Sequence, residues 1–403
     1  MACALALNPG SNSLKFELAE LQPAATKASD LPKLASAAID DVGKGGTMSV
    51  YAGREVIEKH DCPAGDMQEA VRQALAWLRG QETLAPRMAE LAFAAVRTVH
   101  GGERFDRPVA ADAEARQAIE EMEELAPLHN KSSLQVLEVL DSELKGVRLN
   151  VVFDTAFHRT LPEVAWRYPI ERETADRFGV RKFGFHGISH RYMLEQYAAA
   201  VGKRPSECTI VTLHLESGSS ACAIRDGVSV DTTMGLTPLE GLMMGSRCGS
   251  VDPAIVPYLM GKMGVGTDEL MQLLEKKSGL LGIAGGSLDT RVLVKREDRW
   301  AKLALEMYGY RVRLAVGAYL AALGDGCEAV VFGGGIGEDS PWVRTAVCAG
   351  LGGWGMVLDE AVNAGAVSGM ARVSAEGSRL EAWSMAVEEG LEMIWECMSL
   401  EKA

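Results

Sequence analysis

A segment that combines a β-strand, a glycine–serine turn and a returning strand occurs twice in the sequence, and this repeat restricts the possible folds most. The first copy places Asn8 to Lys15 (NPGSNSLK) between two strand-like runs. The second places Glu216 to Ser220 (ESGSS) between apolar segments at 209–215 and 221–224. Such a hairpin brings backbone amides and hydroxyls to one edge, where they can hold oxyanions. Its double use predicts two related α/β halves.

The length of the chain also favours two domains. A single hydrophobic core rarely grows beyond roughly 250 to 300 residues, and this chain has 403. The run Val147 to Phe153 reads as a buried strand that ends in Asp154, and the second copy of the repeat follows it. Because no clear linker is present, we place the boundary just after Asp154.

The overall charge limits the possible partners. The sequence has 55 acidic and 41 basic residues, and its formal net charge is −14. This balance argues against nucleic acid as a partner, so an anionic ligand needs a local cationic site. No stretch is apolar enough for a membrane span, and the N-terminal strand lacks the features of a signal peptide. We therefore expect a cytoplasmic protein that contacts no membrane, with its eight cysteines reduced and mostly buried.

Charged residues lie at the ends of several predicted strands. Arg97 is near the end of the buried pattern Glu90 to Val99, and Asp154 ends the next buried strand. In open α/β sheets, ligands collect at the carboxyl ends of the strands. Phosphoryl transfer needs cations, oxygen ligands for a metal, and glycine turns. Gly333 to Glu338 (GGGIGE) is one such turn. The pattern indicates a phosphotransferase. The candidate residues are Asn8, Ser11, Ser13, Lys15, Arg97, His129, Asp154, His186, Arg247, Asp289 and Arg291.

Taken in order, these segments resemble the acetate kinase family, which belongs to the larger sugar kinase, Hsp70 and actin superfamily. The matching motifs are NPGSNSLK at 8–15, RTVHGG at 97–102, PLHN at 127–130, FDTAFH at 153–158, GFHGISH at 184–190, DTTMGLTPLEGLMMGSR at 231–247, SGLLGI at 278–283 and GIGE at 335–338. The resemblance implies an α/β fold of two actin-like (ribonuclease H-like) domains that flank a nucleotide cleft. It places the first domain at 1–156, with a C-terminal helix at 390–403 packing on it. The second, at 157–389, would bind the nucleotide and dimerise.

The resemblance also implies catalytic roles. Arg97 and Arg247 would neutralise the substrate carboxylate and the phosphoryl group in flight, and Asp154 would lie near the metal or handle protons. His186 would donate to the transition state, with His129 supporting it. Without the resemblance, such histidines and arginines are more often ordinary hydrogen-bonding or ion-pair residues. Their positions in the motifs favour the catalytic interpretation.

The remaining implied sites concern the metal, the nucleotide and the acyl group. Mg²⁺, or Mn²⁺ in its place, would be held by Asn8 and a C-terminal glutamate that we place at Glu388 rather than Glu389. ATP is the implied phosphoryl donor, and its phosphates would be bordered by Ser11, Ser13 and Lys15. The other implied nucleotide-binding residues are His214, Leu215, Glu216, Ser217, Gly218, Asp289, Thr290, Arg291, Gly335, Ile336, Gly337, Glu338 and Asp339. The implied acyl pocket, with small apolar walls that fit a methyl or ethyl group, consists of Arg97, Val99, Leu128, Phe185 and Pro238.

The resemblance implies a homodimer that uses ATP to phosphorylate a short-chain carboxylate, reversibly and by direct in-line transfer. Acetate is the first candidate, with propionate or butyrate as alternatives. The second phosphate loop departs from the family pattern, because His-Leu-Gly-Asn-Gly is replaced by His214 to Gly218 (HLESG). An acid beside the expected phosphates could repel the nucleotide, assist a metal or point outward. A nucleotide or acyl-phosphate binder without turnover is therefore the alternative interpretation of Glu216 and Ser217.

Overall fold

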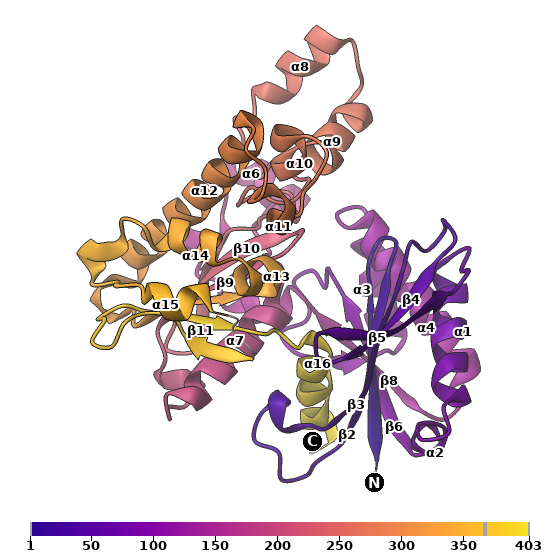
Figure 1. Cartoon of the computed structure of the whole chain (residues 1–403). Coiled ribbons are helices and arrows are strands. Elements are labelled where there is room, and N and C mark those ends of the chain that lie inside the picture. The colour runs from indigo at the N-terminus through magenta and orange to yellow at the C-terminus, as the bar shows by residue number, and fades with distance from the viewer. Residues whose placement is uncertain (1, 366–368, 402–403) are drawn as a thin grey trace. The chain divides into compact units, whose positions relative to one another are not determined.

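The chain forms two compact units (Figure 1). The computed structural model describes residues 2–365 and 369–401, with the side chains of Pro127, Leu128 and Glu401 outside the described part. Unit 1 consists of Met1–Arg159 and Glu388–Ala403, and unit 2 of Thr160–Val387. The sequence placed the boundaries at 156/157 and 389/390, three and two residues away from these divisions. Each unit is a sheet covered by helices, which confirms the expected α/β class.

The sheet of unit 1 brings three strand ends to one edge. Its strand order is β5-β4-β3-β2-β1-β6-β8-β7. β1 is antiparallel to β2, with Asn8 opposite Lys15, and parallel to β6, which is parallel to β8. The carboxyl ends of β1, β6 and β8 therefore lie side by side. The strands are β1 (Cys3–Pro9), β2 (Leu14–Glu20), β3 (Lys33–Asp40), β4 (Thr47–Ala52), β5 (Glu55–Asp61), β6 (Leu91–Thr98), β7 (Val109–Ala110) and β8 (Arg148–Phe153).

Helices cover both faces of this sheet. α1 begins after Asp66, whose side chain caps the helix by accepting a hydrogen bond from the Glu69 amide at 2.8 Å. Its apolar stripe, which includes Val71, Leu75 and Leu78, packs into the core on one face. α16 packs against β1 and β6 from the other side (Figure 1). The helices are α1 (Met67–Gly80), α2 (Ala85–Ala89), α3 (Ala113–Glu121), α4 (Pro127–Glu143) and α16 (Glu389–Met398).

Unit 2 repeats the arrangement of unit 1. Its strand order is β11-β10-β9-β12-β14-β13, with β9 antiparallel to β10 and parallel to β12, and β12 parallel to β14. The series β11-β10-β9-β12-β14 has the topology of β3-β2-β1-β6-β8, as the sequence repeat predicted. β3 (KLASAAID) gave no signal in the sequence, because alanine and serine have little strand preference. The strands are β9 (Ile210–Leu215), β10 (Ser219–Arg225), β11 (Val228–Thr232), β12 (Ala329–Gly333), β13 (Met370–Arg372) and β14 (Glu381–Met385).

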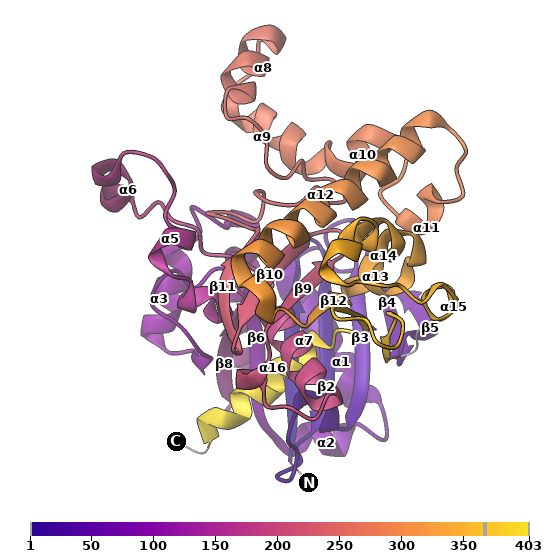
Figure 2. The same ribbon diagram turned by 90° about the vertical axis from the view of Figure 1, so that its left-hand side faces the viewer.

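The sheet of unit 2 lies between α12 and α7 (Figure 2). α12 packs with Val211, Leu213 and Leu215 of β9 in one core. Because side chains alternate along a strand, Thr212 and His214 point toward α7. No helix in the described ranges is long and apolar enough to cross a membrane. The helices are α5 (Glu163–Trp166), α6 (Arg172–Phe178), α7 (Gly187–Ala200), α8 (Ile255–Met263), α9 (Thr267–Lys276), α10 (Gly279–Ala284), α11 (Thr290–Leu293), α12 (Arg299–Leu323), α13 (Gly334–Asp339), α14 (Pro341–Cys348) and α15 (Glu360–Ala364).

Candidate active site

Three of the predicted side chains meet at the carboxyl edge of the unit 1 sheet. Arg97, near the end of β6, donates from Nε to Asp154 Oδ1 at 2.9 Å and from Nη2 to Asp154 Oδ2 at 2.6 Å. Its Nη1 donates to Asn8 Oδ1 at 2.9 Å. The side chains of Arg97 and Asp154 are 15% and 1% exposed. A bidentate, largely buried pair of this kind holds the guanidinium in one orientation.

The two C-terminal glutamates have different partners. Glu389 Oε2 accepts a hydrogen bond from Asn8 Nδ2 at 2.8 Å. Glu388 instead forms an ion pair with Lys33, which also contacts Glu17 at 3.3 Å. Glu388 is the residue before α16 and has non-helical dihedrals, so its side chain leaves the backbone in another direction. The carboxylate beside Asn8 therefore belongs to Glu389, whereas the sequence placed it at Glu388.

The turn between β1 and β2 is tight and accessible. Gly10 N donates to Ser13 O at 2.7 Å, and a Cβ on Gly10 would lie 2.7 Å from Ser13 Oγ, so a larger residue there would displace the Ser13 hydroxyl. Ser11 and Lys15 are exposed, and Ser13 is half-buried. The turn has the hydroxyls and the cation that the sequence assigned to phosphate binding, and that role stays a prediction.

Asn130 fixes the start of α4 against the segment that follows β6. It is fully buried; its Oδ1 accepts from His100 N at 3.1 Å and its Nδ2 donates to His100 O at 2.9 Å. One turn on, Ser133 Oγ donates to Arg97 O at 2.9 Å. His129 is therefore carried on a helix start that is anchored to the Arg97 strand. The sequence singled out His129, and the structure adds Asn130 as its support.

In unit 2, two donors border Gly218 at the turn between β9 and β10. A Cβ at Gly218 would lie 3.4 Å from Arg247 Nη1 and 3.5 Å from His186 Nε2. Arg247 Nη1 also donates to Pro238 O at 3.1 Å. His186 precedes α7 with a φ of 59°, in the left-handed region that non-glycine residues seldom adopt. Strained conformations of this kind collect at functional sites. The missing side chain of Gly218 leaves a space that both donors reach.

A chain of hydrogen bonds runs from His186 into the interior. His186 Nδ1 lies 2.9 Å from Ser220 Oγ, which lies 2.9 Å from His190 Nε2. His190 Nδ1 lies 2.8 Å from Thr212 Oγ1. Ser220, His190 and Thr212 are each fully buried. The His186 ring also lies against the ring of His214, with centroids 4.5 Å apart. The sequence assigned catalytic or nucleotide-binding roles to His186 and His214 but none to the three residues that hold His186.

Glu216, the acid in the second phosphate loop, faces the glycines that open α13. Its Oε2 lies 4.0 Å from His214 Nε2, and its side chain is 41% exposed. A Cβ on Gly334 would lie 3.0 Å from Glu216 Cγ, and one on Gly335 would lie 4.0 Å from its Oε1. The carboxylate is therefore directed toward the segment at which the sequence predicted the ATP phosphates.

The other predicted nucleotide-binding segments are near one another. Asp289 caps α11, accepting from Arg291 N at 2.8 Å, and the Arg291 side chain returns to it with bonds of 3.0 and 2.9 Å. Hydrogen bonding to Asp289 raises the pKa of Arg291, and Asp339 at the end of α13 adds to the shift. The buried Arg344 donates to two carbonyls near the end of α13 at 2.9 and 2.6 Å. Gly335 to Asp339 are therefore a fixed helix rather than an open turn.

The remaining predicted residues differ in exposure. Phe185 and Val99 are buried, and Pro238 is half-buried. The side chain of Leu128 lies outside the described residues. Of the implied nucleotide-binding residues not yet placed, Ser217 is exposed, Ile336 is half-buried, and Leu215, Gly337, Thr290 and Glu338 are buried. Their contacts with ATP or an acyl group stay predictions.

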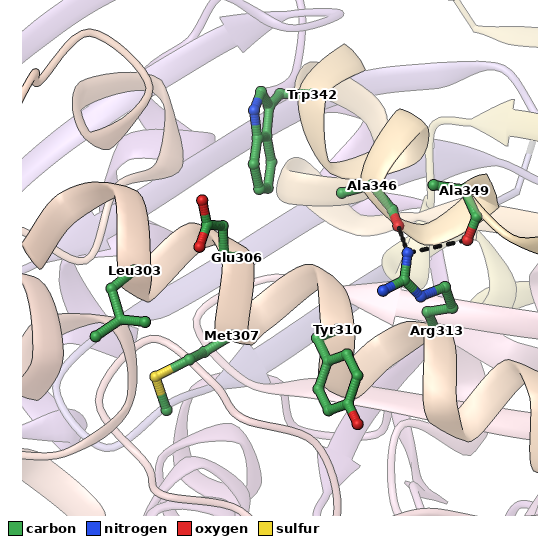
Figure 3. Close-up of a pocket in the computed structure, with 8 residues that line it drawn as sticks. All are labelled: Leu303, Glu306, Met307, Tyr310, Arg313, Trp342, Ala346 and Ala349. Atoms are coloured by element: carbon green, nitrogen blue, oxygen red, sulfur yellow. Dashed lines mark hydrogen bonds between the residues drawn. The ribbon is translucent and has the colours of Figure 1, made fainter. Parts of the chain in front are cut away.

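A pocket away from these residues opens between α12 and α14 (Figure 3). Arg313 closes one end of it by donating to the carbonyls of Ala346 and Ala349 at 3.3 and 3.0 Å. None of the residues that the sequence predicted for the site lines it. Its lining consists of Leu303, Glu306, Met307, Tyr310, Arg313, Trp342, Ala346 and Ala349.

Comparison with known proteins gives one consistent result. The sequence pattern described as "Acetokinase family" matches residues 3–395. The acetate kinase of Chloroherpeton thalassium is 39% identical over 401 residues, which cover 96% of each chain. The crystal structure of Porphyromonas gingivalis acetate kinase is 33% identical, with a TM-score of 0.90 over 100% of both chains. A propionate kinase structure from Francisella tularensis is 30% identical, with a TM-score of 0.88 over 98% of this chain and 99% of that one.

Proposed function

The chain belongs to the acetokinase family, and from this premise we propose that it transfers the γ-phosphoryl group of ATP to acetate. An acetate carboxylate oxygen forms a bond to phosphorus while the bond from phosphorus to the β,γ-bridging oxygen breaks, so that acetyl phosphate and ADP are formed. The same steps run in reverse. The names of the relatives, acetate kinase and propionate kinase, support a short-chain carboxylate as the acceptor.

The observation that carries the proposal is the approach of Arg247 and His186 to one space beside Gly218. In phosphoryl transfer, charge is spread over the oxygens of the moving group, and donors that are already in place stabilise it. A guanidinium and an imidazole N–H that reach the same space are suited to two of these oxygens. Glycine at 218 keeps that space open.

In unit 1, Arg97 is suited to bind the carboxylate of acetate. The bidentate contact with Asp154 fixes its plane, and a planar guanidinium matches a carboxylate in shape and charge. Val99, Leu128, Phe185 and Pro238 are proposed to enclose the methyl group. One additional methylene changes binding by only about 1 to 3 kcal/mol, so propionate is expected to compete with acetate.

The donor set beside Arg97 fits a magnesium ion. Asn8 and Glu389 carry oxygen ligands of the kind that Mg²⁺ prefers. Here Asn8 Oδ1 accepts from Arg97 Nη1 and Asn8 Nδ2 donates to Glu389, so the Asn8 amide would turn its oxygen toward the ion. Within residues 2–365 and 369–401, no group of three or more His, Cys, Asp or Glu could hold a metal ion. When bound, Mg²⁺ would neutralise phosphate charge. We propose Asn8 and Glu389, in place of Glu388, as its protein ligands, with Mn²⁺ as a possible replacement.

An acyl phosphate assay tests the proposed activity. Purified protein is incubated with acetate, propionate or butyrate, each with ATP, GTP or pyrophosphate, and the acyl phosphate is trapped with hydroxylamine. We expect the largest yield with acetate and ATP in the presence of Mg²⁺. If no pairing yields an acyl hydroxamate, the kinase proposal is wrong.

Glu216 favours one second candidate, a nucleotide or acyl-phosphate binder without turnover. Its carboxylate faces Gly334 and Gly335, where it would stand near the donor phosphates, and like charges in such a position repel. Calorimetry separates the two functions. Tight binding of ATP or acetyl phosphate by a protein that gives no hydroxamate would support the binder.

The assembly and location of the protein are also part of the proposal. We expect a homodimer that pairs through unit 2, as implied by the family resemblance, and action in the cytosol, where ATP is regenerated. Light scattering during size-exclusion chromatography tests the first point. A mass equal to the 43.2 kDa of one chain at micromolar concentration would contradict it.

A further inference from the structure

We propose that Thr212, His190 and Ser220 form a proton-ordered chain that fixes His186 as the neutral tautomer with its proton on Nε2. The inference builds on the proposed function, because Nε2 is the His186 nitrogen that reaches the space beside Gly218. In this role the three buried residues are positioning residues. They determine which His186 nitrogen can donate to the phosphoryl group.

The direction of the hydrogen bonds in this chain is set at Thr212. Its hydroxyl carries a single proton, and His190 Nδ1, at 2.8 Å, is the partner of Thr212 Oγ1 among the described residues. If His190 Nδ1 carried a proton and donated it to Thr212, the Thr212 proton would have no acceptor. An unsatisfied buried hydroxyl costs about 1 to 3 kcal/mol, and Thr212 is fully buried. The Thr212 hydroxyl therefore donates to His190 Nδ1.

The remaining protons follow from this first one. A neutral His190 that accepts at Nδ1 carries its proton on Nε2, so it donates to Ser220 Oγ at 2.9 Å. The Ser220 hydroxyl, having accepted there, turns its own proton toward His186 Nδ1 at 2.9 Å. His186 accepts at Nδ1, so in its neutral form it carries the proton on Nε2. The two hydroxyls and the His190 N–H then each have an acceptor.

The consequence is a donor that needs no additional proton. A neutral imidazole with its proton on Nδ1 would present a lone pair to the phosphoryl oxygens and repel them. The ordered chain excludes this form, and the N–H points toward the space shared with Arg247.

The test is nuclear magnetic resonance of protein labelled with ¹⁵N in its seven histidines. Long-range ¹H–¹⁵N correlations distinguish a ring nitrogen that carries a proton from one that does not. The His186 signals are assigned by their loss in His186→Gln. At neutral pH we expect the proton on Nε2 in the wild-type protein without ligands. A wild-type His186 with its proton on Nδ1 would overturn the proposal, whatever the activity assay shows.

Thr212→Val tests the order from its far end, with Thr212→Ser as the matched control. Valine keeps the shape of threonine but removes the hydroxyl, so both proton orders leave one group unsatisfied and a mixture of His186 tautomers is expected. kcat should fall by roughly two- to tenfold at unchanged KM, because only part of the population then holds the reactive tautomer. Thr212→Ser should retain the wild-type spectrum and kcat. A single Nε2 tautomer in Thr212→Val would show that Thr212 does not set the order.

The spectra also separate this inference from the proposed function. If the protein gives no acyl phosphate but His186 carries its proton on Nε2 and responds to Thr212→Val, the proton order stands and the kinase proposal fails. If acyl phosphate forms while His186 has its proton on Nδ1, the kinase proposal stands and the proton order fails.

Discussion

Replacing Gly218 with alanine tests whether Arg247 and His186 serve one phosphoryl group. The new Cβ would lie 3.4 Å from Arg247 Nη1 and 3.5 Å from His186 Nε2, which is ordinary van der Waals contact. Gly218 has no positive φ, so its backbone conformation is open to alanine. We therefore expect the free energy of unfolding to change by less than about 1 kcal/mol.

The effect on catalysis should be much larger than the effect on stability. The methyl group would project between the two donors and keep a phosphoryl oxygen from approaching both of them. The loss of one such donor typically lowers kcat by about 100- to 1,000-fold, which corresponds to about 2.7 to 4 kcal/mol. We expect Gly218→Ala to lower kcat by at least about 100-fold, with KM for acetate nearly unchanged because Arg97 is not altered.

The matched control is Gly317→Ala in α12, where a Cβ would have no neighbour within 4 Å. This variant should retain full activity and gain about 0.5 to 1 kcal/mol of stability, because alanine is preferred over glycine inside a helix. The hydroxamate assay gives kcat, and urea unfolding gives stability. A Gly218→Ala enzyme with kcat within about threefold of wild type would refute the shared phosphoryl site. A large loss of stability would refute the steric argument.

Four further predictions follow from other contacts. Asp154→Asn should lower the free energy of unfolding by about 3 kcal/mol, measured in urea, because it leaves the mostly buried Arg97 without its counter-charge; an unchanged midpoint would contradict this. Glu216→Gly should lower KM for ATP by about tenfold by removing a charge beside the phosphates, and an unchanged KM would mean that the carboxylate does not approach them. Glu389→Gln should raise the Mg²⁺ concentration needed for half-maximal activity more than Glu388→Gln does, since Glu389 lies beside Asn8; the reverse order would restore Glu388 as the ligand. Burial raises the pKa of the Cys222 and Cys348 thiols from 9.0 to about 12. Between pH 9.0 and 12 only the unfolded state loses these protons, so the thermal midpoint should fall as the pH rises through this range. A constant midpoint would argue against the burial of the two thiols.

Much of the fold could be predicted because local sequence patterns indicate it. The repeated strand–turn–strand unit predicted two related halves, and the sheets of both units have the corresponding topology. The apolar runs before Arg97 and Asp154 predicted strands that end at one edge, and the two side chains form an ion pair there. The sequence did not predict β3, because its three alanines and one serine pack in the sheet only when neighbouring strands are present.

The details of the site depend on partners far away in the sequence. Asn8 and Glu389 are 381 positions apart and hydrogen-bonded, while the adjacent Glu388 turns to Lys33. A shift of one residue in where the helix begins decides which of these two carboxylates faces Asn8. No local sequence pattern predicts the start of a helix to within one residue.

The sequence by itself therefore determined the α/β class, the internal repeat and the candidate residues for phosphate binding, because strand periodicity and glycine turns are local properties. Only the tertiary structure decided which glutamate meets Asn8, where the carboxylate of Glu216 points, and which residues hold His186. The chain through Ser220, His190 and Thr212 joins β10, α7 and β9. Its direction depends on a buried hydroxyl having a single acceptor, and that condition exists only once the three elements have packed together.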